Sequence, residues 1–172
     1  MNNFHSLTLL FFISLTLGYC DSKNENMSIT TIQNWQKLLQ KNRENILQLF
    51  EGSNEQVEHN VGYEKLKPLD AIFDPSFHPA TFYFSGDRVA LIYIREQKAL
   101  HNVNPKDLKS AWGPGIELNS RAGQEMTHIA YPQQGVAFTL EEERIRFLEI
   151  FPPMSIEKYK DSIYEDPGAF TK

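Results

Sequence analysis

The change in hydrophobic periodicity at Gly52 constrains the fold of this chain more than any other feature. Between Thr31 and Glu51, apolar residues recur every three or four positions and polar side chains fill the positions between them. This spacing predicts an amphipathic helix of about 20 residues that ends at Gly52. Its charges are of both signs, which favours packing on a core over lying on a membrane surface. The polar segment Gly52–Gly62 is expected to be a connector.

Beyond the connector the pattern becomes typical of strands. Thr81–Phe84 and Val89–Ile94 are rich in aromatic and branched residues, and Ser85-Gly86-Asp87 between them predicts a hairpin turn. A helix followed by strands with short turns predicts an α+β fold, with a single antiparallel sheet and the N-terminal helix packed on it. Further strands are expected at Thr127–Tyr131, Val136–Thr139 and Ile145–Phe151. The expected core residues are Leu38, Ile46, Leu91, Ile94, Phe147 and Ile150.

Two short helices are predicted by their end signals. Asn104 followed by Pro105 is typical of a helix start, and Trp112-Gly113 is typical of a helix end. Ser155 is expected to cap a last helix, from Ile156 to about Tyr164.

Two pairs of segments resemble each other. Lys67–Pro75 aligns without gaps to Lys106–Pro114, and Asp87–Ile94 aligns to Glu143–Ile150. One interpretation is an internal duplication of a unit made of a helix-like turn and a hairpin. The other is chance, because apolar strands resemble one another in composition.

The N-terminal segment indicates export. Met1–Cys20 contains no Asp, Glu, Lys or Arg, and Leu7–Leu17 is an apolar run too short to cross a bilayer comfortably as a helix. Such a run is typical of the hydrophobic part of a secretory signal peptide. Cys20 is the sole cysteine, so no internal disulfide can form.

The residues around Cys20 resemble a bacterial lipoprotein signal. Leu17-Gly18-Tyr19-Cys20 stands at the end of the apolar run and is followed by a polar segment. The resemblance implies cleavage after residue 19 and acylation of Cys20, which would hold the protein on a membrane. The expected organisation is then a signal peptide (1–19), a tether (20–30) and one α+β domain (31–172). Ordinary secretion into the periplasm or medium, or an uncleaved anchor, are the alternatives.

A second resemblance concerns the region around Trp112. Leu108, Trp112, Gly113 and Pro114, with Gly135 in the hairpin that follows, resemble a helix-plus-hairpin unit. This unit is shared by the small lipoprotein of the outer-membrane β-barrel assembly machinery and the secreted β-lactamase inhibitor proteins. The resemblance implies a related fold and a role in binding rather than catalysis.

No sequence motif predicts catalysis, a metal site or a cofactor. The five histidines have no metal-ligand spacing, and neither a nucleophile elbow nor a phosphate loop is present. The net charge of −5 disfavours a nucleic-acid partner.

The sequence therefore predicts a lipid-anchored cell-envelope protein that acts as a binding or accessory module for an envelope protein partner. The expected partner surface comprises Trp112, Tyr131 and the hairpin around Gly135, because aromatic side chains beside a turn often form interfaces. Tyr159, Tyr164 and Phe170 near the C-terminus are expected to clasp either the body of the domain or a partner.

Two alternative functions remain open from the sequence. One is a secreted or periplasmic inhibitor or immunity-type protein, whose acidic charge would favour association with a basic enzyme. The other is a periplasmic enzyme with a site assembled from residues far apart in the chain, for which the candidates are His78, Asp87, Arg88 and His128.

Overall fold

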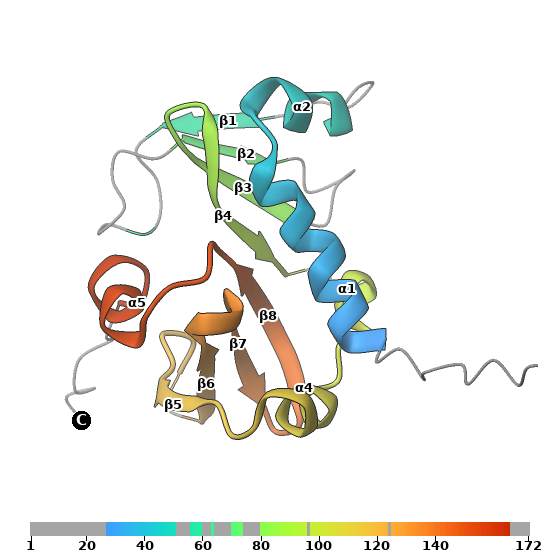
Figure 1. Cartoon of the computed structure of the whole chain (residues 1–172), viewed down its shortest axis with the longest axis vertical. Helices are drawn as coiled ribbons and strands as arrows, with labels where there is room; N and C mark the ends of the chain where they lie inside the picture. The colour runs from blue at the N-terminus through green and yellow to red at the C-terminus, as the bar shows by residue number, and fades with distance from the viewer. Residues whose placement is uncertain are drawn as a thin grey trace, which may run out of the picture.

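The structure is a computed structural model that describes residues 27–50, 56–59, 63, 70–73, 80–95, 97–123 and 125–165. The expected signal peptide, Cys20, His78 and Phe170 lie outside the described residues. The strands form one sheet, and helices lie on both of its faces (Figure 1).

The sheet has eight strands in the order β1-β2-β3-β4-β8-β7-β6-β5, and every neighbouring pair is antiparallel. The predicted α+β class with a single antiparallel sheet is therefore confirmed. The strands are β1 (Gln56–His59), β2 (Asp70–Phe73), β3 (Ala80–Ser85), β4 (Arg88–Ile94), β5 (Ile116–Asn119), β6 (Met126–Tyr131), β7 (Val136–Glu141) and β8 (Arg144–Ile150).

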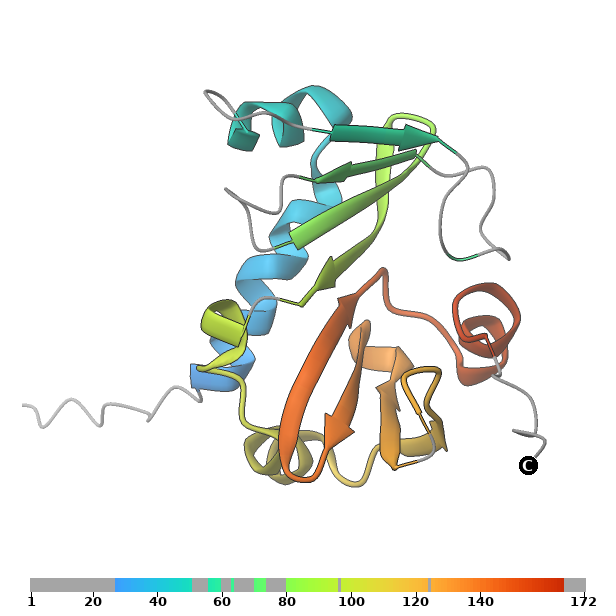
Figure 2. The ribbon, with the colours of Figure 1, turned by 180° about the vertical axis from the view of Figure 1, so that it is seen from behind.

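The sheet consists of two four-stranded meanders, β1–β4 and β5–β8, which meet where β4 pairs with β8 (Figure 2). The hairpin β3–β4 starts at residue 80 and the hairpin β7–β8 at residue 136, an offset of 56 positions. A register shift falls between Tyr83 and Phe84 in one hairpin and between Thr139 and Leu140 in the other, at the same offset. The alignment of Asp87–Ile94 with Glu143–Ile150 therefore joins equivalent elements.

The alignment of Lys67–Pro75 with Lys106–Pro114 does not join equivalent elements, so this part of the proposed duplication is wrong. Asp70–Phe73 is a strand that pairs with β1 and β3, whereas the segment aligned to it lies in the helix α4 (Pro105–Trp112). The polar connector is also not a simple loop, because it contains β1. Both errors concern strands of four residues, β1 at the sheet edge and β2 beside it, which are too short to show a clear apolar alternation.

The predicted continuous N-terminal helix is interrupted. Lys41 is extended, with φ −84° and ψ 146°, and the side chain of Asn42 accepts a hydrogen bond from the Asn45 N–H to start a new helix. The first helix also begins at Met27, inside the expected tether, and Ser28 is buried. The segment consists of α1 (Met27–Gln36), the 3₁₀ turn η1 (Lys37–Gln40), α2 (Arg43–Leu47) and the 3₁₀ turn η2 (Gln48–Phe50).

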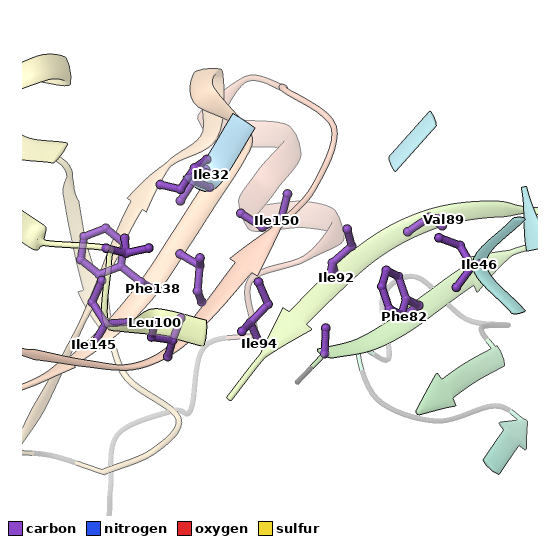
Figure 3. Packing of buried hydrophobic residues seen from close by; sticks show 14 of the residues in the cluster. Ile32, Ile46, Phe82, Val89, Ile92, Ile94, Leu100, Phe138, Ile145 and Ile150 are labelled. Carbon is purple, nitrogen blue, oxygen red and sulfur yellow. The ribbon is translucent and has the colours of Figure 1, made fainter. Parts of the chain in front are cut away.

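The main core lies between these helices and one face of both meanders. Ile46 from α2 is buried over the first meander near Phe82 and Val89, and Ile32 from α1 is buried over the second meander near Ile150 (Figure 3). Leu38 and Phe147, which were expected in the core, are only half-buried. The other four expected core residues are buried: Ile46, Leu91, Ile94 and Ile150.

The second meander is preceded by two shorter helices. The sequence patterns did not predict α3 (Gln97–Leu100), but α4 has the predicted ends. The Asn104 side chain accepts a hydrogen bond from the Lys106 N–H, and Gly113 ends the helix. On the opposite face of the sheet lies α5 (Ile156–Ser162), capped by Ser155 as predicted.

Candidate functional site

The end of α4 forms a rigid corner, which we call the Trp112 corner (Trp112, Gly113 and Tyr131). Gly113 has φ 79°, a conformation that side chains rarely adopt, and this lets the chain turn sharply after the helix. The Trp112 ring lies 5.3 Å from the Tyr131 ring at 63°. The Tyr131 hydroxyl donates a hydrogen bond to the Gly113 carbonyl at 3.0 Å. The structure thus brings together Trp112 and Tyr131, two of the three residues predicted for the partner surface, but Tyr131 is largely buried.

A cleft of about 790 Å³ lies between α4 and the second meander, and we call it the α4 cleft. This volume is in the range of small-molecule sites in proteins. One side of its lining is the loop and helix from Val103 to Lys109, and the other is the sheet. Its floor is hydrocarbon: Leu100, Val103, Ile129, Phe138, Leu140 and Ile145.

The rim of the α4 cleft carries charges of both signs. Lys106 on α4 forms an ion pair with Glu143 in the β7–β8 turn, with Nζ and Oε2 3.0 Å apart. Both side chains are mostly exposed, so we expect this pair to contribute little to stability. The remaining charged rim residues are Lys109, Glu117, Glu142 and Arg144.

A smaller hollow of about 250 Å³ lies on the other side of the Trp112 corner. Trp112, Tyr131 and Gln134 border it, and Ile156 from α5 closes one side. The Trp112 corner therefore stands between two concave regions.

Gly135 was expected on the partner surface, and the structure buries it instead. It has φ 68° in the turn between β6 and β7, and its carbonyl accepts a hydrogen bond from the Phe151 N–H at 2.9 Å. A Cβ atom here would clash with the carbonyl oxygen of Phe151. Gly135 thus permits close packing of two backbone segments and offers no contact surface.

Polar side chains are buried together on the opposite face of the sheet. The Glu149 carboxylate accepts hydrogen bonds from the Tyr63 hydroxyl at 2.6 Å and from the Tyr159 hydroxyl at 3.4 Å. Tyr159 Oη also lies 2.7 Å from His128 Nε2, so α5 is fastened to the sheet through this network. We call it the buried polar cluster; its members are Tyr63, His128, Thr139, Glu149 and Tyr159. The exposed Arg121 borders it, with its guanidinium 3.7 Å from the Glu149 carboxylate.

The contacts of His128 define one consistent proton arrangement. Because Tyr159 donates to Glu149, it can accept from a protonated Nε2 of His128. Nδ1 of His128 is then free to accept from the Thr139 hydroxyl at 3.0 Å. This is the neutral form of the imidazole, held by a partner at each ring nitrogen.

Burial governs the ionisation of the cluster. Burial, together with the nearby positive charge of Arg121, lowers the pKa of His128 to about 4. Burial raises the pKa of Glu149, although the hydrogen bonds from the two tyrosines and the charge of Arg121 oppose the rise. Burial and the adjacent carboxylate raise the pKa of Tyr159 and of Tyr63. At neutral pH, the cluster therefore holds a neutral imidazole and two neutral phenols.

Of the residues proposed for an enzyme site, the three that the structure describes do not converge. The carbonyl of Asp87 accepts from the Arg43 N–H, and Arg88 pairs with Asn42 through the backbone, both at the β3–β4 turn. His128 instead lies on β6 within the buried polar cluster. Among residues 27–165 that the structure describes, no three His, Cys, Asp or Glu side chains are placed to hold a metal ion.

Tyr159 clasps the body of the domain, one of the two roles predicted for it. Tyr164 also contacts the body, because its hydroxyl donates to the Asn119 carbonyl at 3.0 Å. No sequence pattern indicated Glu149 as a functional residue. Its only signal is a carboxylate between the apolar residues Leu148 and Ile150, which are both buried, because a charged group in such a place needs partners.

No helix in the described part of the chain is long and apolar enough to cross a membrane. No model of a known protein family matches the chain, and no curated protein matches it. A solved structure, that of a DUF4309 family protein (YjgB) from Bacillus subtilis, is similar at a TM-score of 0.45 and 12% identity. The match covers 73% of this chain and 97% of that one. At these values the likeness gives no basis for assigning a function.

Proposed function

We propose that the protein is a lipid-anchored binding module of the bacterial cell envelope, and that it holds its ligand in the α4 cleft. The observation that carries this proposal is the cleft itself, which combines a hydrocarbon floor with a charged rim. Sites of this kind gain affinity from apolar contact and selectivity from a few polar groups.

The Trp112 corner supports the proposal because it fixes one end of the cleft. Tyr131 lines the cleft and is held by the Gly113 carbonyl and by the Trp112 ring. A site that is already ordered before binding loses less conformational entropy when its ligand arrives. We infer that Trp112 acts by positioning Tyr131 and by separating the two hollows.

The anchor is proposed from the sequence around Cys20. An acylated Cys20 would keep the module at a membrane, where a high effective concentration of membrane-borne ligands raises occupancy even at weak affinity. An accessory role beside an envelope protein follows from the same placement.

Two measurements test this function. In cell fractionation, the wild-type chain should remain with membranes and carry an acyl mass on Cys20, whereas Cys20→Ala should be released or accumulate uncleaved. A photo-crosslinking residue at Lys109 on the cleft rim should form a discrete adduct in intact cells. The same residue at Lys160, on the outer side of α5, is the control and should form none. Identical fractionation of wild type and Cys20→Ala would refute the anchor, and equal labelling from both positions would refute the cleft.

A further inference from the structure

The first described residues place the proposed membrane anchor next to the α4 cleft. Ser28 Oγ donates a hydrogen bond to Asp107 and accepts one from the backbone N–H of Asn104, each at 2.9 Å. Asn104 itself lines the cleft. The N-terminal end of α1 is therefore fastened to the cleft wall, and Figures 1 and 2 show this end beside α4.

The length of chain before Met27 limits how far the cleft can lie from the bilayer. Cys20 and Met27 are separated by the six residues 21–26. Even fully extended, this segment spans at most about 25 Å. If Cys20 is acylated, the cleft wall stays within that distance of the membrane surface, and the ligand most available to it is a membrane lipid.

The chemistry of the cleft matches such a lipid. The floor residues present only hydrocarbon, from side chains such as Leu140 and Ile145. The rim presents cations at Lys109 and Arg144 and carboxylates at Glu117 and Glu142. A rim of both signs complements a headgroup that carries a phosphate and an ammonium, and it does not favour a purely anionic ligand.

We propose that the α4 cleft binds one acyl chain of a zwitterionic membrane phospholipid, with the headgroup at the charged rim. This inference names the ligand of the proposed function and rests on it. The acyl chain supplies most of the affinity because it removes apolar surface from water on both sides. The rim residues select the headgroup.

The test is titration calorimetry on the full chain carrying Cys20→Ala, so that its own acyl groups cannot occupy the cleft. The probes are decanoyl, dodecanoyl and tetradecanoyl lysophosphatidylethanolamine below their micelle concentrations. Each methylene buried should tighten binding about fourfold until the cleft is filled. A stoichiometry of one with this chain-length dependence supports the inference, and affinity independent of chain length overturns it.

Two matched substitutions separate cleft binding from general adsorption. Leu140→Trp fills the floor of the cleft and should weaken dodecanoyl lysophosphatidylethanolamine at least about tenfold. Leu47→Trp makes the same change at a half-buried position on α2 and should leave binding unchanged. Circular dichroism verifies that both variants fold. If both variants lose affinity equally, or if neither loses affinity, the lipid does not occupy the cleft.

The headgroup is tested with dodecanoate, which lacks both the phosphate and the ammonium. Dodecanoate should bind more weakly than the lysophospholipid, and Glu117→Ala should reduce that difference. Equal affinity for the two probes overturns the assignment to a phospholipid. If lipids fail but the Lys109 crosslink identifies an adduct of polypeptide mass, this inference is wrong and the proposed binding function stands. If neither a lipid nor a crosslink is found, both fail.

Discussion

The two meanders of this protein use the same strand scaffold under different helical covers. Their last hairpins, β3–β4 and β7–β8, match at an offset of 56 residues, including the position of the register shift. Over the first meander, α2 and η2 bring Ile46 and Phe50 onto the sheet and close the core. Over the second, α3 and α4 leave the α4 cleft open above the equivalent strands. One scaffold therefore yields either a closed core or a binding site, depending on how its helices cover it.

The opposite faces of the two meanders differ as well. In the register of the second meander, His128 pairs with Thr139, and the corresponding pair in the first meander is Ala71 with Tyr83. Glu149 corresponds to Tyr93 at the offset of 56. The buried polar cluster thus occupies positions that hold an alanine and two tyrosines in the other meander. The second meander carries both unusual features of the molecule.

The largest effect that tests this comparison comes from the equivalent residues Phe82 and Phe138. Phe82 is packed against Phe50 in the closed core, so Phe82→Ala should lower the free energy of unfolding by about 4 kcal/mol. Phe138 borders the α4 cleft, so the space left by Phe138→Ala can join a region that solvent enters. We expect a loss of about 2 kcal/mol there. Urea unfolding measures both, and equal losses would contradict the difference in cover.

The pH dependence of stability tests the second difference. The pKa of His128 is about 4 in the folded protein and about 6.5 when unfolded, so the unfolded chain binds a proton first as the pH falls. The wild type should therefore lose up to about 3 kcal/mol between pH 6.5 and 4, relative to His128→Gln. Glu149 has a raised pKa and acts in the opposite direction, but it is present in both proteins.

Urea unfolding of both proteins at several pH values gives this difference. Parallel stability curves for wild type and His128→Gln would show that the imidazole is not held neutral in the buried polar cluster. The control is Ala71→Gln, at the equivalent position in the first meander. It should lower the free energy of unfolding by the same amount at every pH between 6.5 and 4.

A smaller effect is expected at Gly135, in the turn of the second meander that packs on Phe151. Gly135→Ala should lower the free energy of unfolding by about 2 kcal/mol, because it combines a positive φ with a clash against backbone. Gly113→Ala has open space around the new methyl group, but φ 79° with ψ −170° is a conformation that essentially only glycine adopts, so about 1.5 kcal/mol is expected. Thermal or urea unfolding measures both losses, and a larger loss for Gly113→Ala than for Gly135→Ala would contradict the clash at Gly135.

The smallest effect concerns the two equivalent hairpin turns. Gly86 and Glu142 are 56 positions apart and both have positive φ, 64° and 56°. Glu142→Gly should stabilise the protein by about 0.5 kcal/mol, because glycine adopts this conformation without strain. Gly86→Ala should destabilise it by about 1 kcal/mol. If Glu142→Gly instead destabilises the protein, its turn and that of Gly86 are not equivalent.

The sequence was sufficient for the elements with strong periodicity and buried apolar runs. The hairpin strands around Phe82 and Phe138 and the capped helix after Asn104 were predicted at nearly their observed bounds. The break in the N-terminal helix had a readable signal, since six polar residues separate Leu39 from Ile46 and interrupt the spacing.

Other features could not be predicted because they depend on tertiary structure. The strand β5 lies at the sheet edge with Ile116 and Glu117 exposed, so it lacks the alternation that identifies half-buried strands. The buried polar cluster joins Tyr63 to Glu149 across 86 positions. The α4 cleft arises from how far α4 stands from the sheet, which no local pattern encodes.

The hydrogen bonds of Ser28 also have a consequence for the order of folding. Each meander closes mostly through hairpins between neighbouring strands, whereas Ser28 contacts Asn102 and Asp107 across 74 and 79 positions. The β4–β8 junction between the meanders rests on three residue pairs and likewise joins distant segments. Contacts between distant segments form slowly because the intervening chain must first be restrained. We therefore expect the hairpins to form early and the docking of α1 across the junction to complete the native topology, so the α4 cleft gains its full wall only in the last step.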